Sequence, residues 1–207
     1  MKFLKRIFFK GHTFQVCREV YEPAEDTFLL AENLTLNGGE RVLDVGTGCG
    51  ILGILAAEKA METLALDINP HAVRCARMNA RLNNVESKMS FICGDLFNPI
   101  RIGEKFDLII FNAPYLPAKM EGREWIELAW SGGSDGREIM DRFLFQAPNY
   151  LSDDGRILLV QSSLSNINKT MERFKEMRLK ARVIAEEKLD FEKIVVIEAE
   201  RRHEHTS

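Results

Sequence analysis

The chain has 207 residues, of which 45% are hydrophobic and 29% are charged, and this composition indicates one globular domain over residues 1–207. Its formal net charge of -3 disfavours naked nucleic acid as a partner, because phosphate binding requires a basic surface. Four cysteines lack CxxC pairs and metal-ligand spacing, and no secretory signal is apparent, so we expect reduced thiols, no bound metal and a cytoplasmic location. The cysteines are Cys17, Cys49, Cys75 and Cys93.

Residues 1–40 are expected to form an N-terminal arm and one helix. Met1 to Lys10 is basic and apolar, and its charges interrupt any stretch long enough for a signal core or a membrane span. We therefore predict a short strand or a docking arm there. A helix is predicted to begin within Tyr21 to Leu30, where acids in the first turn favour the helix dipole. Glu22, Glu25 and Asp26 are interpreted as solvated residues of this helix start.

Residues 41–200 alternate between strand-like and helix-like segments, the pattern of a parallel sheet with helices on both faces. Several strand candidates are continuous apolar runs, as expected of buried parallel strands. Asp154-Gly155 is interpreted as a turn after the third helix, Leu189-Asp190 as a turn between the last two strands, and 201–207 as a frayed tail. The predicted strands are Arg41 to Val45, Thr63 to Asp67, Met89 to Cys93, Phe106 to Phe111, Arg156 to Gln161, Arg182 to Glu187 and Lys193 to Glu198, and the predicted helices are Ile51 to Ala60, Ala72 to Leu82, Arg137 to Tyr150 and Asn166 to Met177.

A glycine-rich loop, Asp44 to Gly50, lies between the first of these strands and the helix that begins at Ile51. Glycines at 46, 48 and 50 let the backbone pass close to a ligand, and the helix amides that follow favour anionic groups. The fingerprint of nicotinamide dinucleotide sites, G-x-G-x-x-G, would place its third glycine where Ile51 stands, so the loop fits that fingerprint poorly. The loop alone is also compatible with a tight strand-to-helix turn.

Two further acids follow the next strands of the predicted sheet. Asp67 ends its strand, where an acid in a doubly wound sheet can accept hydrogen bonds from both ribose hydroxyls of a nucleoside. It could instead cap the helix that begins near Pro70. Gly94-Asp95-Leu96 follows the third strand and, taken alone, is nearly as well explained by a plain turn.

The pattern Asp-x-Gly-x-Gly-x-Gly at residues 44–50 resembles motif I of class I S-adenosylmethionine methyltransferases. This resemblance implies a Rossmann-like α/β domain with a seven-stranded, mostly parallel sheet, and S-adenosylmethionine as the cofactor. It places the methionine part of the cofactor over the loop, with Asp44 near the amino group. It also implies that Asp95 binds the adenine amino group and that Leu96 forms an apolar wall beside the ring.

The segment Asn112-Ala113-Pro114-Tyr115 resembles the Asn-Pro-Pro-Tyr motif of methyltransferases that modify amide or exocyclic amino nitrogens. Such nitrogens are weak nucleophiles, so the enzyme must orient them. The Asn112 side chain and the Ala113 carbonyl, directed by Pro114, are expected to accept the two hydrogens. Tyr115 is expected to cover the planar group and face the positive charge. Ala113 replaces the usual first proline but keeps its carbonyl. Without the glycine loop, the segment would be interpreted as a loop with a packed tyrosine.

The stretch from Val20 to Leu30 resembles the signature of the archaeal and eukaryotic HemK-related glutamine methyltransferases, and the resemblance extends to about Ser163. It continues through Asp67 to Pro70, Asn112 to Pro117 and Ala129 to Phe143. In that family the Thr27 position touches the cofactor. The implied cofactor-binding residues are therefore Thr27, Asp44, Gly46, Gly48, Gly50, Asp67, Asp95, Leu96 and Asn112, and the implied catalytic residues are Asn112, Ala113, Pro114 and Tyr115.

The resemblance implies methylation of the Gly-Gly-Gln glutamine of a class I translation release factor. It also implies a heterodimer with a small zinc-binding activator, for which the third strand is a candidate edge, with Met89, Phe91 and Cys93 as contacts. Bacterial HemK-type enzymes carry a helical domain before motif I, whereas about forty residues precede it here. The alternatives are a protein lysine acceptor, adenine N6 in nucleic acid after base flipping, and a binding module that keeps the fold without catalysis.

Overall fold

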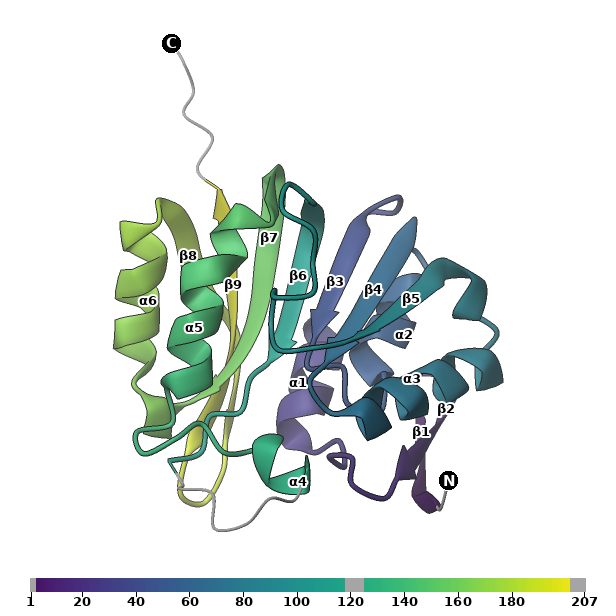
Figure 1. The fold of residues 1–207 in the computed structure, drawn as a ribbon. Helices are drawn as coiled ribbons and strands as arrows, with labels where there is room; N and C mark the ends of the chain where they lie inside the picture. Colours follow the sequence, from purple (N-terminus) through teal and green to yellow (C-terminus); the bar gives the residue numbers. More distant parts are fainter. Residues whose placement is uncertain (1–2, 118–124, 202–207) are drawn as a thin grey trace.

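The computed structural model describes residues 3–117 and 125–201, and a seven-stranded sheet lies at its centre (Figure 1). The strand order is β5-β4-β3-β6-β7-β9-β8. Neighbouring strands are parallel except at β9, which is antiparallel to both β7 and β8. This confirms the predicted seven-stranded, mostly parallel α/β sheet. The strands are β3 (Arg41–Val45), β4 (Glu62–Asp67), β5 (Met89–Cys93), β6 (Phe106–Asn112), β7 (Leu151–Ser162), β8 (Leu179–Lys188) and β9 (Lys193–Arg201).

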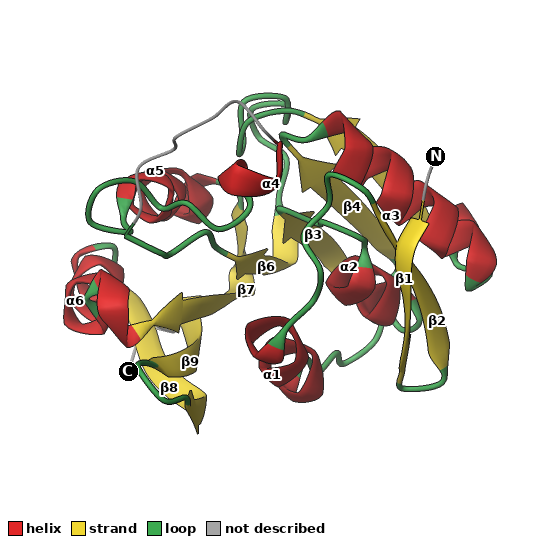
Figure 2. Cartoon of the chain, turned by 90° about the horizontal axis from the view of Figure 1, so that it is seen from below, coloured by secondary structure: helices red, strands yellow, loops and turns green. Residues whose placement is uncertain are grey.

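Helices cover both faces of the sheet (Figure 2). α1, α2 and α3 pack on one face, and α5 and α6 pack on the other. Within residues 3–117 and 125–201, no helix is both long and apolar enough to cross a membrane. The α-helices are α1 (Glu25–Asn33), α2 (Ile51–Ala57), α3 (Pro70–Leu82), α4 (Trp125–Leu128), α5 (Glu138–Gln146) and α6 (Ile167–Glu176), and three short 3-10 turns are Glu86–Lys88, Ala147–Asn149 and Ser163–Ser165.

The sheet separates two hydrophobic cores. Successive residues of a strand point to opposite faces, so Val42 of β3 joins the core beneath α1, α2 and α3, whereas Leu43 and Val45 join the core beneath α5 and α6. None of these three side chains is more than 1% exposed. Because both faces are covered, the central strands carry apolar side chains in both directions, which explains their continuous apolar sequences.

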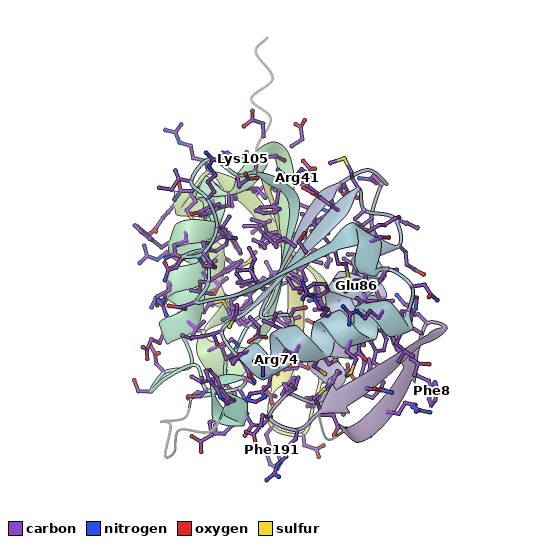
Figure 3. All side chains as sticks on the ribbon, turned by 45° about the vertical axis from the view of Figure 1, so that its right-hand side comes forward. Phe8, Arg41, Arg74, Glu86, Lys105 and Phe191 are labelled. Carbon is purple, nitrogen blue, oxygen red and sulfur yellow. The ribbon has the colours of Figure 1, made fainter. Side chains whose placement is uncertain are left out.

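The N-terminal residues form a hairpin of β1 (Phe3–Phe9) and β2 (His12–Cys17) that lies against α3, outside the main sheet (Figure 1). The predicted first strand is confirmed, and β2 was not predicted. The side-chain amide of Asn79 accepts a hydrogen bond from Gln15 N at 2.9 Å and donates one to Gln15 O at 2.9 Å. Asn83, one turn later, makes the same pair of bonds with Thr13. Two asparagine side chains therefore take the place of a neighbouring strand, while Phe8 on the hairpin stays 73% exposed (Figure 3).

Two sequence interpretations near the third helix are wrong. Asp154-Gly155 lies inside β7 and is not a turn, because the register of β6 against β7 shifts here and the strand bulges. Gly155 suits this bulge, since a Cβ atom would lie 2.9 Å from the carbonyl oxygen of Phe106. The helix itself ends at Gln146 and continues as a 3-10 turn containing Pro148, which lacks the N–H of a continuing helix.

The predicted pair of C-terminal strands and the turn between them agree with the structure. β8 and β9 form an antiparallel pair, and their connection is closed by a hydrogen bond from Leu189 N to Glu192 O at 2.8 Å. Phe191 in this turn is 93% exposed (Figure 3). Arg201 belongs to β9, and the rest of the expected tail, 202–207, lies outside the described residues.

Candidate active site

A pocket of about 970 Å³ opens at the carboxyl ends of the central strands. Loops that leave β3, β4, β5 and β6 meet there with α1 and α4. Ligand sites in parallel α/β sheets lie at this edge, and the volume suits a cofactor together with part of a substrate. Of the residues expected in the site, ten line the pocket: Thr27, Gly46, Gly48, Asp67, Asp95, Leu96, Asn112, Ala113, Pro114 and Tyr115.

The glycine loop adopts backbone conformations that favour glycine. Gly46, Gly48 and Gly50 have φ angles of 67°, 56° and 92°. Gly50 lies behind the pocket wall, where a Cβ atom would come within 3.0 Å of the Cα atom of Ala76 in α3. The expected close approach at Gly50 is therefore to a neighbouring helix, while Gly46 and Gly48 face the pocket.

Asp44 lies beneath the loop and is completely buried, so it is not part of the pocket wall. Its Oδ2 accepts hydrogen bonds from Thr47 Oγ1 at 2.6 Å and from Gly53 N at 2.9 Å. Its Oδ1 is buried and has no hydrogen-bond partner among the described residues. Burial raises the pKa of the Asp44 carboxyl group to about 7. Asp44 therefore holds the glycine loop against the start of α2 through Oδ2, and its Oδ1 remains available to a further donor.

Asp67 joins the glycine loop to the start of α3. Its Oδ2 accepts a hydrogen bond from Gly48 N at 2.9 Å, and its Oδ1 accepts one from Asn69 N at 2.8 Å. Asn69 is the N-cap of α3 and accepts a hydrogen bond from His71 N. Asp67 therefore does not cap this helix, and it faces the pocket. Burial raises the pKa of the Asp67 carboxyl group.

Asp95 and Leu96 follow β5 along the chain and form part of the pocket wall. Leu96 has a φ angle of 48° and is 6% exposed, so its side chain is held in the pocket lining. The carboxylate of Asp95 pairs with the guanidinium of Arg142 on α5 and accepts a hydrogen bond from Asn98. The pairing of Arg142 with Asp95 was not predicted, because an ion pair across forty-seven positions has no local signature.

The segment after β6 brings an amide, a carbonyl and a phenol together. Asn112 Nδ2 donates a hydrogen bond to Thr27 Oγ1 at 2.9 Å, and Asn112 Oδ1 is buried with no partner among residues 3–117 and 125–201. Tyr115 donates its hydroxyl hydrogen to Asp26 Oδ2 at 3.0 Å. Burial, followed by the charge of Asp26, raises the pKa of Tyr115, which keeps the phenol protonated. Ala113 is 2% exposed.

The interpretation of Asp26 as a solvated residue is wrong, because it is only 5% exposed. Its carboxylate accepts hydrogen bonds from Tyr21, Tyr115 and the backbone and hydroxyl of Thr27. Glu25 is exposed, and Glu22 pairs with Lys5 on the surface, as expected of solvated acids. The two phenols gave a signal that could have located Asp26, since buried tyrosine hydroxyls require partners.

A second segment fixes the position of Tyr115. Leu116 N donates to Trp130 O at 3.1 Å, and Gly132 N donates to Leu116 O at 3.0 Å. A Cβ atom on Gly136 would lie 2.3 Å from the carbonyl oxygen of Tyr115, so only glycine allows this approach. Nine pocket residues that were not predicted in the site also come from this region: Trp125, Leu128, Ala129, Trp130, Ser131, Gly133, Ser134, Glu138 and Ile139.

The fold and the site together define a class I methyltransferase. From β3, the strands β4 and β5 follow toward one edge of the sheet, and near the other edge β9 is inserted antiparallel between β7 and β8. The glycine loop and two acids of the pocket, Asp67 and Asp95, lie at the carboxyl ends of the parallel strands. The solved Mtq2-Trm112 complex of E. cuniculi, described as responsible for methylation of the termination factor eRF1, shares this fold. It aligns with a TM-score of 0.70 at 24% identity, covering 89% of this chain and 99% of that chain.

The family model described as the methyltransferase small domain matches residues 22–188, and the chain belongs to this family. A protein of Methanocaldococcus jannaschii, named as a protein N5-glutamine methyltransferase, is 43% identical over 186 residues, covering 88% of this chain and 92% of the relative. The eRF1 methyltransferase catalytic subunit of Schizosaccharomyces pombe is 30% identical, covering 75% and 78%. The resemblance to HemK-related glutamine methyltransferases is thereby confirmed.

Proposed function

We propose that this chain transfers a methyl group from S-adenosylmethionine to the side-chain amide of the glutamine in the Gly-Gly-Gln motif of a class I translation release factor. The observation that supports this most directly is the amide of Asn112, whose Nδ2 is held by Thr27 while its buried Oδ1 is left without a partner. A buried carbonyl oxygen of this kind is suited to accept an N–H from a planar substrate nitrogen.

The residues of the pocket fit S-adenosylmethionine, which supplies an electrophilic methyl group on a sulfonium when bound. The unpartnered Oδ1 of the buried Asp44 fits a nearby cationic amino group. Asp67 faces the pocket with two carboxylate oxygens and would hold the ribose hydroxyls. Leu96 would cover one face of adenine. Asp95, which is paired with Arg142, would accept a hydrogen bond from the adenine amino group. The glycine loop would let the methionine part approach the backbone, with Gly46 and Gly48 in the lining.

The acceptor amide would be oriented by two oxygens and covered by one aromatic ring. Asn112 Oδ1 would accept one hydrogen and the Ala113 carbonyl the other, which fixes the plane of the amide so that the nitrogen lone pair, perpendicular to this plane, faces the methyl carbon. Tyr115 would lie against the planar group, and its ring would stabilise the positive charge that passes from sulfur toward nitrogen by about 1 kcal/mol. Most of the rate acceleration would come from alignment of the reacting atoms, since no strong base is required before transfer.

A lysine acceptor fits this site less well. An ammonium must lose a proton before it can attack, and Asp26 is the buried carboxylate nearest to Tyr115. That carboxylate already accepts hydrogen bonds from two phenols and from Thr27. It is therefore engaged in fixing the site, whereas a neutral amide needs only the acceptors that the segment presents.

Mass spectrometry of a purified class I release factor, incubated with the enzyme and isotope-labelled S-adenosylmethionine, tests this function. We expect one labelled methyl group on the glutamine of Gly-Gly-Gln, and a release factor with that glutamine changed to alanine should stay unlabelled. Asn112→Ala should lower turnover by about 100-fold or more while cofactor affinity measured by calorimetry stays within a few fold. Label on lysine or on a DNA oligonucleotide alone would contradict the proposal.

We also propose that a small zinc-binding activator pairs with this chain at the free edge of β5. β5 is the terminal strand of the sheet, so its outer backbone groups can extend the sheet with a partner strand. Of the three expected contacts, Met89 is buried in the core, Phe91 is half-buried and Cys93 is exposed. Coexpression with such an activator should raise the yield and the melting temperature, and Ser90→Pro should abolish the pairing. A fully active, monodisperse monomer would count against the partner.

A further inference from the structure

The orientation of the Asn112 amide is set by a chain of hydrogen bonds from α1. Thr27 Oγ1 donates to Asp26 Oδ1 at 3.1 Å, and it accepts from Asn112 Nδ2 at 2.9 Å. A threonine hydroxyl has a single hydrogen and two acceptor lone pairs. Because Asp26 is an acceptor that takes this hydrogen, the hydroxyl presents only lone pairs to Asn112. The asparagine must then turn its NH2 group toward Thr27, which leaves its buried oxygen free to accept from another donor.

Asp26 is itself held in place by several groups. Thr27 N donates to its Oδ1 at 2.5 Å, and the phenols of Tyr115 and Tyr21 donate to its carboxylate at 3.0 Å and 3.3 Å. Asp26 and Thr27 are 5% and 4% exposed, so water does not compete readily for these bonds. The carboxylate therefore links the aromatic cover of the acceptor site to the amide that orients the acceptor.

We propose that Thr27, polarised by Asp26, is a positioning residue that keeps Asn112 Oδ1 directed at the acceptor nitrogen; this rests on the proposed function. The resemblance assigned Thr27 only a contact with the cofactor, and the hydrogen bonds add a second task. If the hydroxyl is removed, the Asn112 amide can rotate by half a turn and present NH2 to the substrate. An NH2 group facing the hydrogens of the substrate amide repels them, and transfer slows.

The test compares Thr27→Val, which keeps the shape and removes the hydroxyl, with Thr27→Ser, which restores the hydroxyl. Single-turnover methylation of the release factor at saturating S-adenosylmethionine should fall by about 10- to 100-fold in Thr27→Val, from the loss of one buried hydrogen bond. Thr27→Ser should restore the rate to within about threefold of the wild type. Cofactor affinity of both variants, measured by calorimetry, separates this effect from a weaker cofactor site.

A second readout needs no substrate. The side-chain NH2 resonance of Asn112, assigned by its absence in Asn112→Asp, should exchange with D2O about tenfold more slowly in the wild type and Thr27→Ser than in Thr27→Val. Equal exchange in all three proteins, equal turnover in wild type and Thr27→Val, or a rate loss shared by Thr27→Ser would overturn the inference. If the wild type fails to label the release factor, the proposed function fails, while the exchange experiment still decides the role of Thr27.

Discussion

In the proposed function, different carboxylates hold the cofactor and orient the acceptor. Asp67 and Asp44, on the neighbouring strands β4 and β3, would lie on the cofactor side. Asp26 lies on the acceptor side and contacts Tyr115. Their separate hydrogen-bond partners imply that substitutions should separate cofactor affinity from turnover, because each carboxylate affects a different step.

Asp67→Ala should weaken S-adenosylmethionine binding by about 10- to 100-fold, because it removes the oxygens expected to accept two ribose hydroxyls and releases Gly48 N. Turnover at saturating cofactor should fall much less. Isothermal calorimetry and methylation at several cofactor concentrations check both parts. Glu176→Ala is the matched control, since this acid is on the surface of α6 and pairs only with Arg173 in the described part of the chain. Unchanged affinity in Asp67→Ala would refute the ribose assignment.

The raised pKa of Asp44 predicts a pH dependence of stability in the protein without cofactor. Its carboxyl has a pKa of about 7 in the folded state and near 3.8 when unfolded, so the folded state binds more protons between these values. The contribution of Asp44 to stability is therefore greatest below pH 4 and is lost as pH rises toward 7. Asp44→Asn does not ionise, so the free energy of unfolding of this variant, relative to wild type, should increase from pH 4 to pH 8.

Urea unfolding of both proteins at several pH values measures this difference. Other groups also titrate in this range, and taking the difference between the two proteins removes their shared contribution. A difference that stays constant with pH, or changes in the opposite direction, would show that Asp44 is not a buried acid with a raised pKa.

At the level of elements, close contact between α2 and α3 fixes the glycine loop. Gly50→Ala should destabilise the protein by about 2 to 4 kcal/mol, because it combines a φ angle of 92° with a Cβ atom only 3.0 Å from the Cα atom of Ala76. Gly103→Ala provides the control, since Gly103 has a φ angle of 94° and open space around its Cα atom. It should cost about 1 kcal/mol.

Thermal and urea unfolding of the two glycine variants give the comparison. If both lose the same stability, backbone strain alone accounts for the effect and the packing of α2 against α3 is not limiting. Cofactor affinity should also fall in Gly50→Ala and stay unchanged in Gly103→Ala, because Gly103 is not part of the pocket lining.

The sequence predicted the elements that follow a local rule. Apolar runs located the strands of the main sheet, and the glycine and asparagine motifs located the pocket edge because parallel strands bring their carboxyl ends together. β2 was missed although it pairs locally with β1, and its other edge is held by Asn79 and Asn83, sixty to seventy positions away, which have no local signature. The bulge at Gly155 was taken for a turn because Asp-Gly is typical of both. The pairing of Arg142 with Asp95 depended on a tertiary contact that local sequence does not encode, and Asp26 could have been located only through the two phenols that require a partner.

At the scale of the whole molecule, Asn79 connects the N-terminal hairpin to the glycine loop. It is fully buried and donates to both Gln15 O and Cys49 O, at 2.9 Å and 2.7 Å. Asn79→Ala should destabilise the protein by about 3 kcal/mol, since it leaves buried backbone groups without partners. Hydrogen exchange should speed up in both β2 and the glycine loop. Asn83→Ala, which loses contacts with the hairpin but not with the loop, should affect β2 alone.

The proposed methyl transfer depends on one contact between the protein and its acceptor. A crystal structure of the enzyme with S-adenosylhomocysteine and a Gly-Gly-Gln peptide measures it directly. We predict a distance of about 2.7 to 3.2 Å between Asn112 Oδ1 and the glutamine amide nitrogen, beneath the Tyr115 ring. A structure in which Asn112 Oδ1 points away from the bound glutamine, or in which the glutamine lies outside the pocket, would contradict the account.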